Sequence, residues 1–121
     1  MIKLALLLTV IMSSAYGANI CKDHVTHGEL KILKICAQIA DDGVLRNPRL
    51  IAKNGIAWPI APGLTPEIRA NKICKRLGFS SVSTFVVREC SSEQATVNLR
   101  GNYALDGAVW SFACLDKINC Q

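Results

Sequence analysis

The sequence predicts a small α+β domain in which disulfide bonds staple an antiparallel sheet to one main helix. Three observations indicate this fold class. Residues 66–77 carry both start and stop signals of a helix. The segments that follow are short, rich in β-branched residues and partly alternating, as is typical of strands. All six cysteines follow a short N-terminal export signal, which is the usage of a disulfide-stabilised exported domain.

Residues 1–17 have the three parts of a secretory signal peptide. Lys3 supplies the positive charge, residues 4–12 are apolar apart from Thr9, and Ala15 and Gly17 are the small residues before a cut. We therefore predict cleavage after Gly17. The apolar run is shorter than the roughly 20 residues that span a bilayer.

A lipid anchor is not expected either, because Ile20 rather than a small residue precedes Cys21. The predicted protein is secreted or periplasmic, without a membrane anchor. Removal of residues 1–17 from the 121 leaves 104 residues, 18–121, as a single domain. Loss of Lys3 leaves 13 Lys and Arg against 9 Asp and Glu, a net charge of +4. Such a moderately basic protein can approach anionic partners.

An even number of cysteines in an oxidising compartment predicts up to three disulfides. The cysteines are Cys21, Cys36, Cys74, Cys90, Cys114 and Cys120.

The segment 29–42 fits two patterns. As a strand it turns Leu33, Ile35, Ala37 and Ile39 inward; as a helix it has a polar stripe at helical spacing. We favour the strand, because residues 50–52 and 56–58 offer pairing partners beyond the turn at 41–43. Residues 58–66 contain three of the four prolines and are expected to form an ordered loop.

The helix at 66–77 is the clearest element. Thr65 is a candidate N-cap and Pro66 suits the first position. Ala70, Ile73, Cys74 and Leu77 form an apolar stripe, and Gly78 can end the helix in a left-handed conformation. The stripe turns Cys74 inward, so we expect it to bond with Cys114 or Cys120.

Three strands are predicted after the helix, at 83–90, 95–99 and 108–115. Turn residues at 100–102 and 106–107 separate them, so that an antiparallel meander is expected. Trp110 and Phe112 fall on the same side of the last strand as Cys114.

Catalytic patterns are weak. Cys21, His24 and His27 have a spacing that could serve a metal, but Cys21 is expected in a disulfide, so no metal or cofactor is predicted. No nucleophile elbow or nucleic-acid pattern occurs. Carboxylates such as Glu89, Glu93, Asp106 and Asp116 do not single out a catalytic pair. We therefore expect a protein that is not an enzyme.

Two sets of residues are candidates for binding. The first is the basic outer face of the helix, formed by Arg69, Lys72, Lys75 and Arg76. The second consists of Trp58 in the proline-rich loop and Tyr103 in a turn, which could form an aromatic platform.

The helix resembles that of scavenger receptor cysteine-rich domains. Their pattern Ala-x-x-x-Cys-Arg-x-Leu-Gly-Phe/Tyr is matched by Ala70, Cys74, Leu77, Gly78 and Phe79. The resemblance implies a helix cradled by a curved sheet, and binding of proteins or polyanions rather than catalysis. The acidic metal-binding cluster of that family cannot be placed on this sequence.

The function expected from the sequence is a non-catalytic binding module for a protein or an anionic polysaccharide at a cell surface or in the periplasm. A small secreted inhibitor or effector that uses the loop 54–65 is the alternative. A small hydrolytic enzyme is the third possibility.

Overall fold

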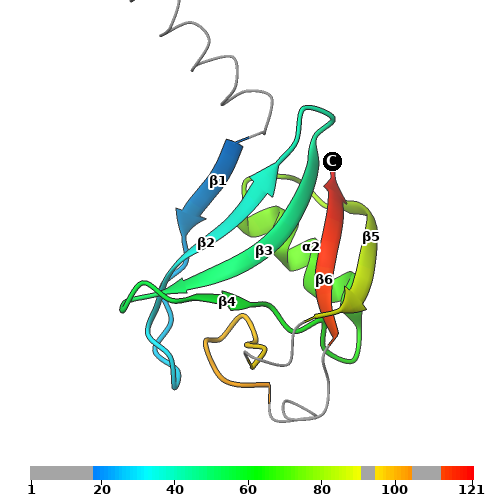
Figure 1. Cartoon of the computed structure of the whole chain (residues 1–121). Helices are drawn as coiled ribbons and strands as arrows, with labels where there is room; N and C mark the ends of the chain where they lie inside the picture. Colours follow the sequence, from blue (N-terminus) through cyan, green and yellow to red (C-terminus); the bar gives the residue numbers. More distant parts are fainter. Residues whose placement is uncertain (1–17, 91–94, 105–112) are drawn as a thin grey trace, which may run out of the picture.

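The computed structural model describes residues 18–90, 95–104 and 113–121 (Figure 1). In these residues the chain forms six strands and one helix. The elements in order are β1 (Ala18–Asp23), β2 (Ile32–Ile39), β3 (Val44–Ala52), β4 (Ala57–Pro59), α2 (Pro66–Arg76), β5 (Val82–Glu89) and β6 (Ala113–Cys120). The predicted α+β class, with an antiparallel sheet packed on one helix, is confirmed. The predicted signal peptide lies outside the described residues.

The sheet is antiparallel throughout, in the order β1-β2-β3-β6-β5, and β4 pairs with the far end of β3. The long strand β3 has two partners on one side: Val44–Arg46 pair with β6, and Arg49–Ile51 pair with β4. Helix α2 lies across the sheet and contacts β5 and β6 (Figure 1). The segment 95–104 lies beside β4 at the lower end of the sheet (Figure 1), where Val97 forms an isolated bridge with Ile60.

The segment 29–42 is a strand over Ile32–Ile39, as favoured from the sequence. It pairs with β3 through the turn at 41–43, where Gly43 has φ of 84°. One part of the prediction is wrong: Leu33 is 42% exposed, whereas Ile32 is fully buried. A register shift between Ile32 and Lys34 interrupts the strict alternation, and it turns Leu33 outward.

Helix α2 confirms the prediction to within one residue, since Leu77 is its C-cap. Ala70, Ile73 and Cys74 are buried, and Gly78 has φ of 99°. Thr65 occupies the N-cap position, but its side chain makes no capping hydrogen bond, so this role was predicted wrongly. Pro66 and the buried stripe therefore define the start of this helix without it.

The hydrophobic core lies between α2 and the strands around β3. It contains fully buried side chains from β2, β3, α2 and β6, including Ile35, Leu45, Leu50, Ile73 and Ile118. No helix among the described residues is long and apolar enough to cross a membrane.

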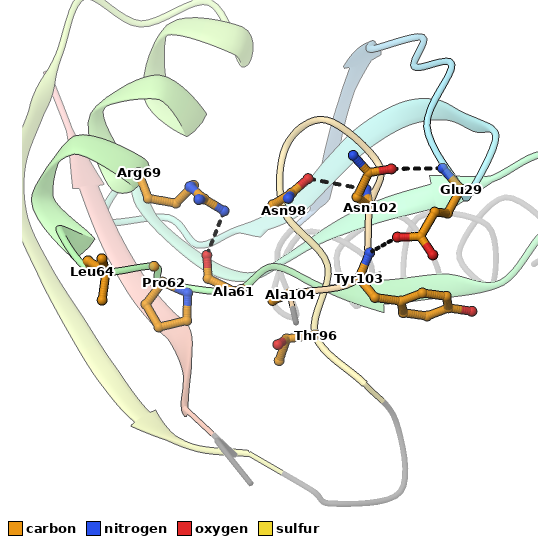
Figure 2. A pocket seen from close by; sticks show the side chains of 11 residues that line it. Glu29, Ala61, Pro62, Leu64, Arg69, Thr96, Asn98, Asn102, Tyr103 and Ala104 are labelled. Carbon is orange, nitrogen blue, oxygen red and sulfur yellow. Dashed lines mark hydrogen bonds between the residues drawn. The ribbon is translucent and has the colours of Figure 1, made fainter. Parts of the chain in front are cut away.

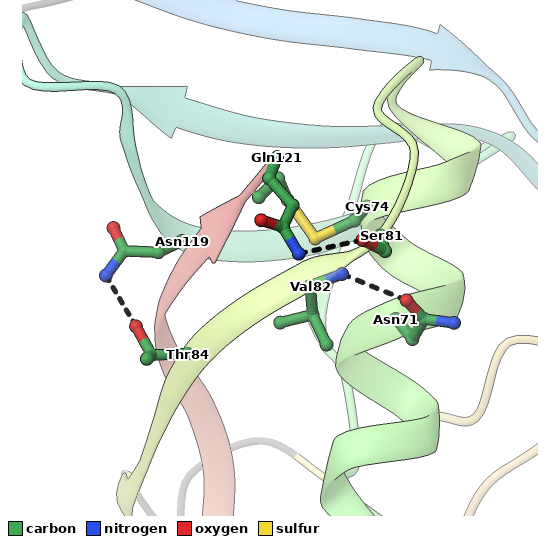
Figure 3. The surroundings of a disulfide bond; sticks show 8 residues. Asn71, Cys74, Ser81, Val82, Thr84, Asn119 and Gln121 are labelled. Atoms are coloured by element: carbon green, nitrogen blue, oxygen red, sulfur yellow. Dashed lines mark hydrogen bonds between the residues drawn. A yellow bond between two sulfur atoms is a disulfide. The ribbon is translucent and has the colours of Figure 1, made fainter.

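Two disulfides staple this framework. Cys74 bonds to Cys120, one of the two partners predicted, and so ties α2 to the last strand (Figure 3). Polar contacts surround this bond: Asn71 Oδ1 accepts a hydrogen bond of 2.9 Å from Val82 N. Cys21 bonds to Cys36 across β1 and β2. Cys90 and Cys114 are thiols in this structure, so a disulfide involving them stays a prediction.

The predicted meander does not form. Residues 95–99 are not a strand: Val97 makes only isolated bridges, to Ile60 and Tyr103. The described part of the last strand is Ala113–Cys120, which overlaps the predicted 108–115 and continues beyond it; this strand pairs directly with β5. Residues 105–112, with Trp110 and Phe112, lie outside the described residues. The alternation of apolar and polar residues at 95–99 led to a wrong strand prediction. The hydrophobic side chains there are buried against a loop and the edge of the core, and no neighbouring strand among the described residues pairs with them.

Candidate functional site

The turn Asn98–Asn102 has a cavity on each side. The larger cavity, of about 920 Å³, lies between this turn, the loop before α2 and the flank of the helix (Figure 2). Its polar lining is supplied by Glu29, Arg69, Thr96, Asn98, Asn102 and Tyr103. Ala61, Pro62 and Leu64 provide an apolar wall. The cavity therefore offers charged and amide groups beside an apolar surface.

The turn is built around one amide side chain. Asn98 Oδ1 accepts hydrogen bonds from the backbone N–H groups of Arg100 (2.9 Å) and Asn102 (3.1 Å). Gly101 has φ of 83°, a conformation that residues with a Cβ seldom adopt. This local geometry holds the Arg100 backbone at the outer part of the turn, where its side chain is exposed.

Residues 24–30 clamp the turn from the other side. The Leu30 N–H donates to Gly101 O at 2.8 Å, and the Glu29 N–H donates to Asn102 Oδ1 at 2.8 Å. His24 is only 8% exposed, and its Nε2 lies 2.7 Å from Leu99 O. Glu29 also accepts a hydrogen bond from Tyr103 N at 3.3 Å. These hydrogen bonds, which are not part of the sheet, hold the turn Asn98–Asn102 in place as a wall of the larger cavity.

Arg69 reaches from α2 into the larger cavity. Its Nη1 donates to Ala61 O at 2.9 Å, which holds the half-buried guanidinium against the loop (Figure 2). Burial, and then repulsion from the charge on Arg100, lower the pKa of Arg69 below its ordinary value. The two positive charges are thus close enough to repel each other.

Arg76 and Arg100 line the second cavity, of about 330 Å³, together with Asp23, His24 and His27. Arg69 and Arg76 are two turns apart on one flank of α2, about 10 Å along the axis. We call Arg69, Arg76 and Arg100 the arginine corner. Within the described residues the ion pair is Arg88–Asp116, and no member of the arginine corner takes part in one.

The structure divides the basic helix face that the sequence predicted. Arg69 and Arg76 belong to the arginine corner, whereas Lys72 and Lys75 are exposed and line neither of the two cavities beside the turn. Arg100 was not predicted as a site residue, because residues 100–102 have the composition of a turn. Glu29 and Asn102 were also missed, since they are joined across 73 residues of the chain. Asn98 was missed although its partners, Arg100 and Asn102, are close in sequence.

The two predicted aromatic residues lie together. The rings of Trp58 and Tyr103 meet edge to face, with centroids 5.6 Å apart and planes at 80°. Both pack against the core, and Tyr103 also lines the larger cavity. Trp58 Nε1 is buried without a hydrogen-bond partner, and both side chains are partly exposed, so a ligand-binding role of this pair stays a prediction.

The considered metal ligands do not converge. Cys21 is in a disulfide, and His24 is engaged with Leu99. Among the described residues, no three His, Cys, Asp or Glu side chains are grouped for a metal. Of the carboxylates weighed for catalysis, Asp116 pairs with Arg88, Glu89 is exposed, and Glu93 and Asp106 lie outside the described residues.

Comparison of the chain with protein-family models, with curated proteins and with solved structures finds no match.

Proposed function

We propose that this protein is a non-catalytic binding module whose arginine corner receives an anionic ligand. The supporting observation is that Arg69 lines the larger cavity, that Arg76 and Arg100 line the smaller one beside the same turn, and that none of them takes part in an ion pair among the described residues. Guanidinium groups bind carboxylate, sulfate and phosphate groups through paired hydrogen bonds. An anion between them would relieve the repulsion between Arg69 and Arg100.

The cavities favour a polymer over a free ion. They lie on both sides of one turn, and together they present amide, carboxylate and hydroxyl groups beside the guanidinium groups. Asn98 and Asn102 can hydrogen-bond neutral hydroxyls of a sugar, while Arg69 and Arg76 are spaced to meet separate charges. We therefore propose an acidic polysaccharide of a cell surface as the ligand. The predicted export and the resemblance to scavenger receptor cysteine-rich domains agree with such a partner, and the disulfides indicate an oxidising compartment.

The direct test is binding of polygalacturonate, with neutral dextran as the control polymer. Replacement of Arg69, Arg76 and Arg100 by Gln should weaken binding about tenfold or more, since each exposed charge pair contributes up to ~1 kcal/mol. The matched control removes the same charge at the exposed Lys34, Lys53 and Lys117 and should lower affinity less than threefold.

Two further variants sharpen this test. Because Arg69 also bonds to Ala61 O, Arg76→Gln/Arg100→Gln separates ligand binding from the integrity of the loop. Lys72→Gln/Lys75→Gln asks whether the outer helix face takes part. Equal losses in the corner and control variants would show unspecific charge attraction, and would overturn the proposed site.

The inhibitor alternative is favoured by one observation. Leu64 is 93% exposed, although Ala61 in the same loop is buried. An inhibitory loop has to enter the cleft of its target enzyme, so secreted peptidases are suitable targets. Inhibition of serine or cysteine peptidases that Leu64→Asp abolishes, together with no binding of polygalacturonate, would favour this alternative.

A further inference from the structure

Cys90 and Cys114 are two thiols at the adjoining ends of β5 and β6. In the register of these strands, Arg88 pairs with Cys114 and Glu89 pairs with Ala113. Cys90 directly follows β5, two residues beyond the partner of Cys114 in this register. The two side chains are hydrogen-bonded to each other. Since all other cysteines are already in disulfides, these two have no competing partner within the chain.

We propose that Cys90 and Cys114 form a third, reversible disulfide, a redox latch that fixes the segment 95–104, which carries Arg100 of the arginine corner. The bond would close a covalent ring that contains residues 95–104. This segment is not part of the six-stranded sheet. Hydrogen bonds connect it to residues 24–30, and the backbone of Val97 is hydrogen-bonded to Pro59 and Ala61. A covalent closure at its base reduces the number of conformations in which these bonds are broken.

The environments of the two thiols set the order of the reaction. Cys114 is 4% exposed, whereas Cys90 is partly exposed. Burial, the hydrogen bond with Cys90 and the charge of Cys90 raise the pKa of Cys114 to about 12. Since the thiolate is the nucleophile, Cys90 reacts first with an external oxidant.

A small-molecule disulfide such as oxidised glutathione is a sufficient oxidant. The Cys90 thiolate attacks one sulfur of glutathione disulfide, forms a mixed disulfide and releases one glutathione thiolate. The Cys114 thiol then loses its proton and attacks the Cys90 sulfur, which breaks the mixed disulfide and releases the second glutathione. The thiol pair gives up two electrons and two protons, and one glutathione disulfide becomes two glutathione thiols.

Trypsin makes the bond directly detectable. Cleavage after Arg88, Arg100 and Lys117 places Cys90 on peptide 89–100 and Cys114 on peptide 101–117. After treatment with oxidised glutathione, mass spectrometry of a non-reducing digest should find these two peptides linked. Two alkylated thiols that persist under these conditions, or a bond from Cys114 to Cys74 on peptide 73–75, would overturn the latch.

The order of attack has its own test. Cys114→Ser should leave Cys90 as a mixed disulfide with glutathione. Cys90→Ser should leave Cys114 unmodified for at least about tenfold longer, because of its burial. Faster modification of Cys114 than of Cys90 would contradict the proposed sequence of steps.

The effect on the site is measured by a readout that needs no ligand. Arg100 is exposed, so brief treatment of the folded protein with trypsin reports opening of the turn. Cleavage after Arg100 should be about tenfold slower in the oxidised protein than in Cys90→Ser/Cys114→Ser. Cleavage after the exposed Lys53 serves as the matched control and should change little. Equal rates after Arg100 would show that the bond does not restrain the turn.

Affinity for polygalacturonate is the second readout, and it rests on the proposed function. The oxidised protein should bind severalfold more tightly than the double Ser variant, because a restrained turn loses less entropy on binding. If the turn is protected from trypsin but neither form binds, the latch stands and the proposed function fails. If both forms bind equally, the latch does not act on the ligand, and that part of the inference is wrong.

Discussion

The helix–sheet framework and the turn Asn98–Asn102 are held by different kinds of interaction. In the framework, α2 buries Ala70, Ile73 and Cys74 against the sheet. The turn is held by polar contacts to residues far away in sequence, such as the bond from Glu29 N to Asn102 Oδ1 with a separation of 73 residues. We therefore expect the framework to tolerate loss of single polar contacts and the turn to depend on them. The turn contributes Arg100 to the arginine corner and lines both cavities.

The largest expected effect is loss of a core side chain. Leu50 is fully buried in β3, so Leu50→Ala should lower the free energy of unfolding by about 3 kcal/mol through lost burial and a residual cavity. Urea unfolding measures this. Leu64→Ala is the matched control because Leu64 is 93% exposed, and it should change stability by less than about 0.5 kcal/mol. Equal losses would mean that the core is misplaced.

The second prediction concerns the backbone of the turn. A Cβ at Gly101 would collide with Thr26 Oγ1 and lie 2.8 Å from Leu30 O, in addition to the positive φ. Gly101→Ala should cost about 2–3 kcal/mol and weaken binding at the arginine corner. In Gly55→Ala the added methyl has nothing within 4 Å, so only the strain of the positive φ of 90° destabilises the variant. This substitution should cost about 1 kcal/mol. Thermal unfolding of both variants separates collision from strain.

The sequence predicted the framework much better than the site. Apolar periodicity and cap residues are local signals, so they were sufficient to predict the positions of α2 and β5 and the inward orientation of Cys74. The same local logic failed at 95–99, where alternation exists without a partner strand. It also could not join Glu29 to Asn102 or Arg69 to Arg100, because such pairs depend on how the chain returns on itself. The predicted helix face contained Arg69 and Arg76 because both residues lie on the same helix. It did not include Arg100, because Arg100 comes near the helix only in the folded chain.

The third prediction separates the shape of the turn from its charge. Asn98→Ala removes the acceptor of two backbone N–H groups and should cost about 1–2 kcal/mol. Asn98→Asp keeps an acceptor oxygen in the same place, so stability should fall by less than about 0.5 kcal/mol. The added carboxylate nevertheless lies in the cavity with Arg69, and it should weaken polygalacturonate binding severalfold. Unchanged binding by a stable Asn98→Asp protein would place the ligand elsewhere.

The smallest expected effect tests whether the framework depends on its local cap. Thr65 makes no capping hydrogen bond, so Thr65→Ala should change stability by less than about 0.3 kcal/mol, against the usual ~1 kcal/mol for this position. Asn71→Ala breaks the bond from Val82 N to Asn71 Oδ1, and should cost about 0.5–1 kcal/mol after the gain in helix propensity. A larger loss from Thr65→Ala than from Asn71→Ala in chemical unfolding would mean that the helix start is capped in solution. The framework would then resemble the turn in relying on single polar contacts, and the contrast between the two regions would be weaker than their packing indicates.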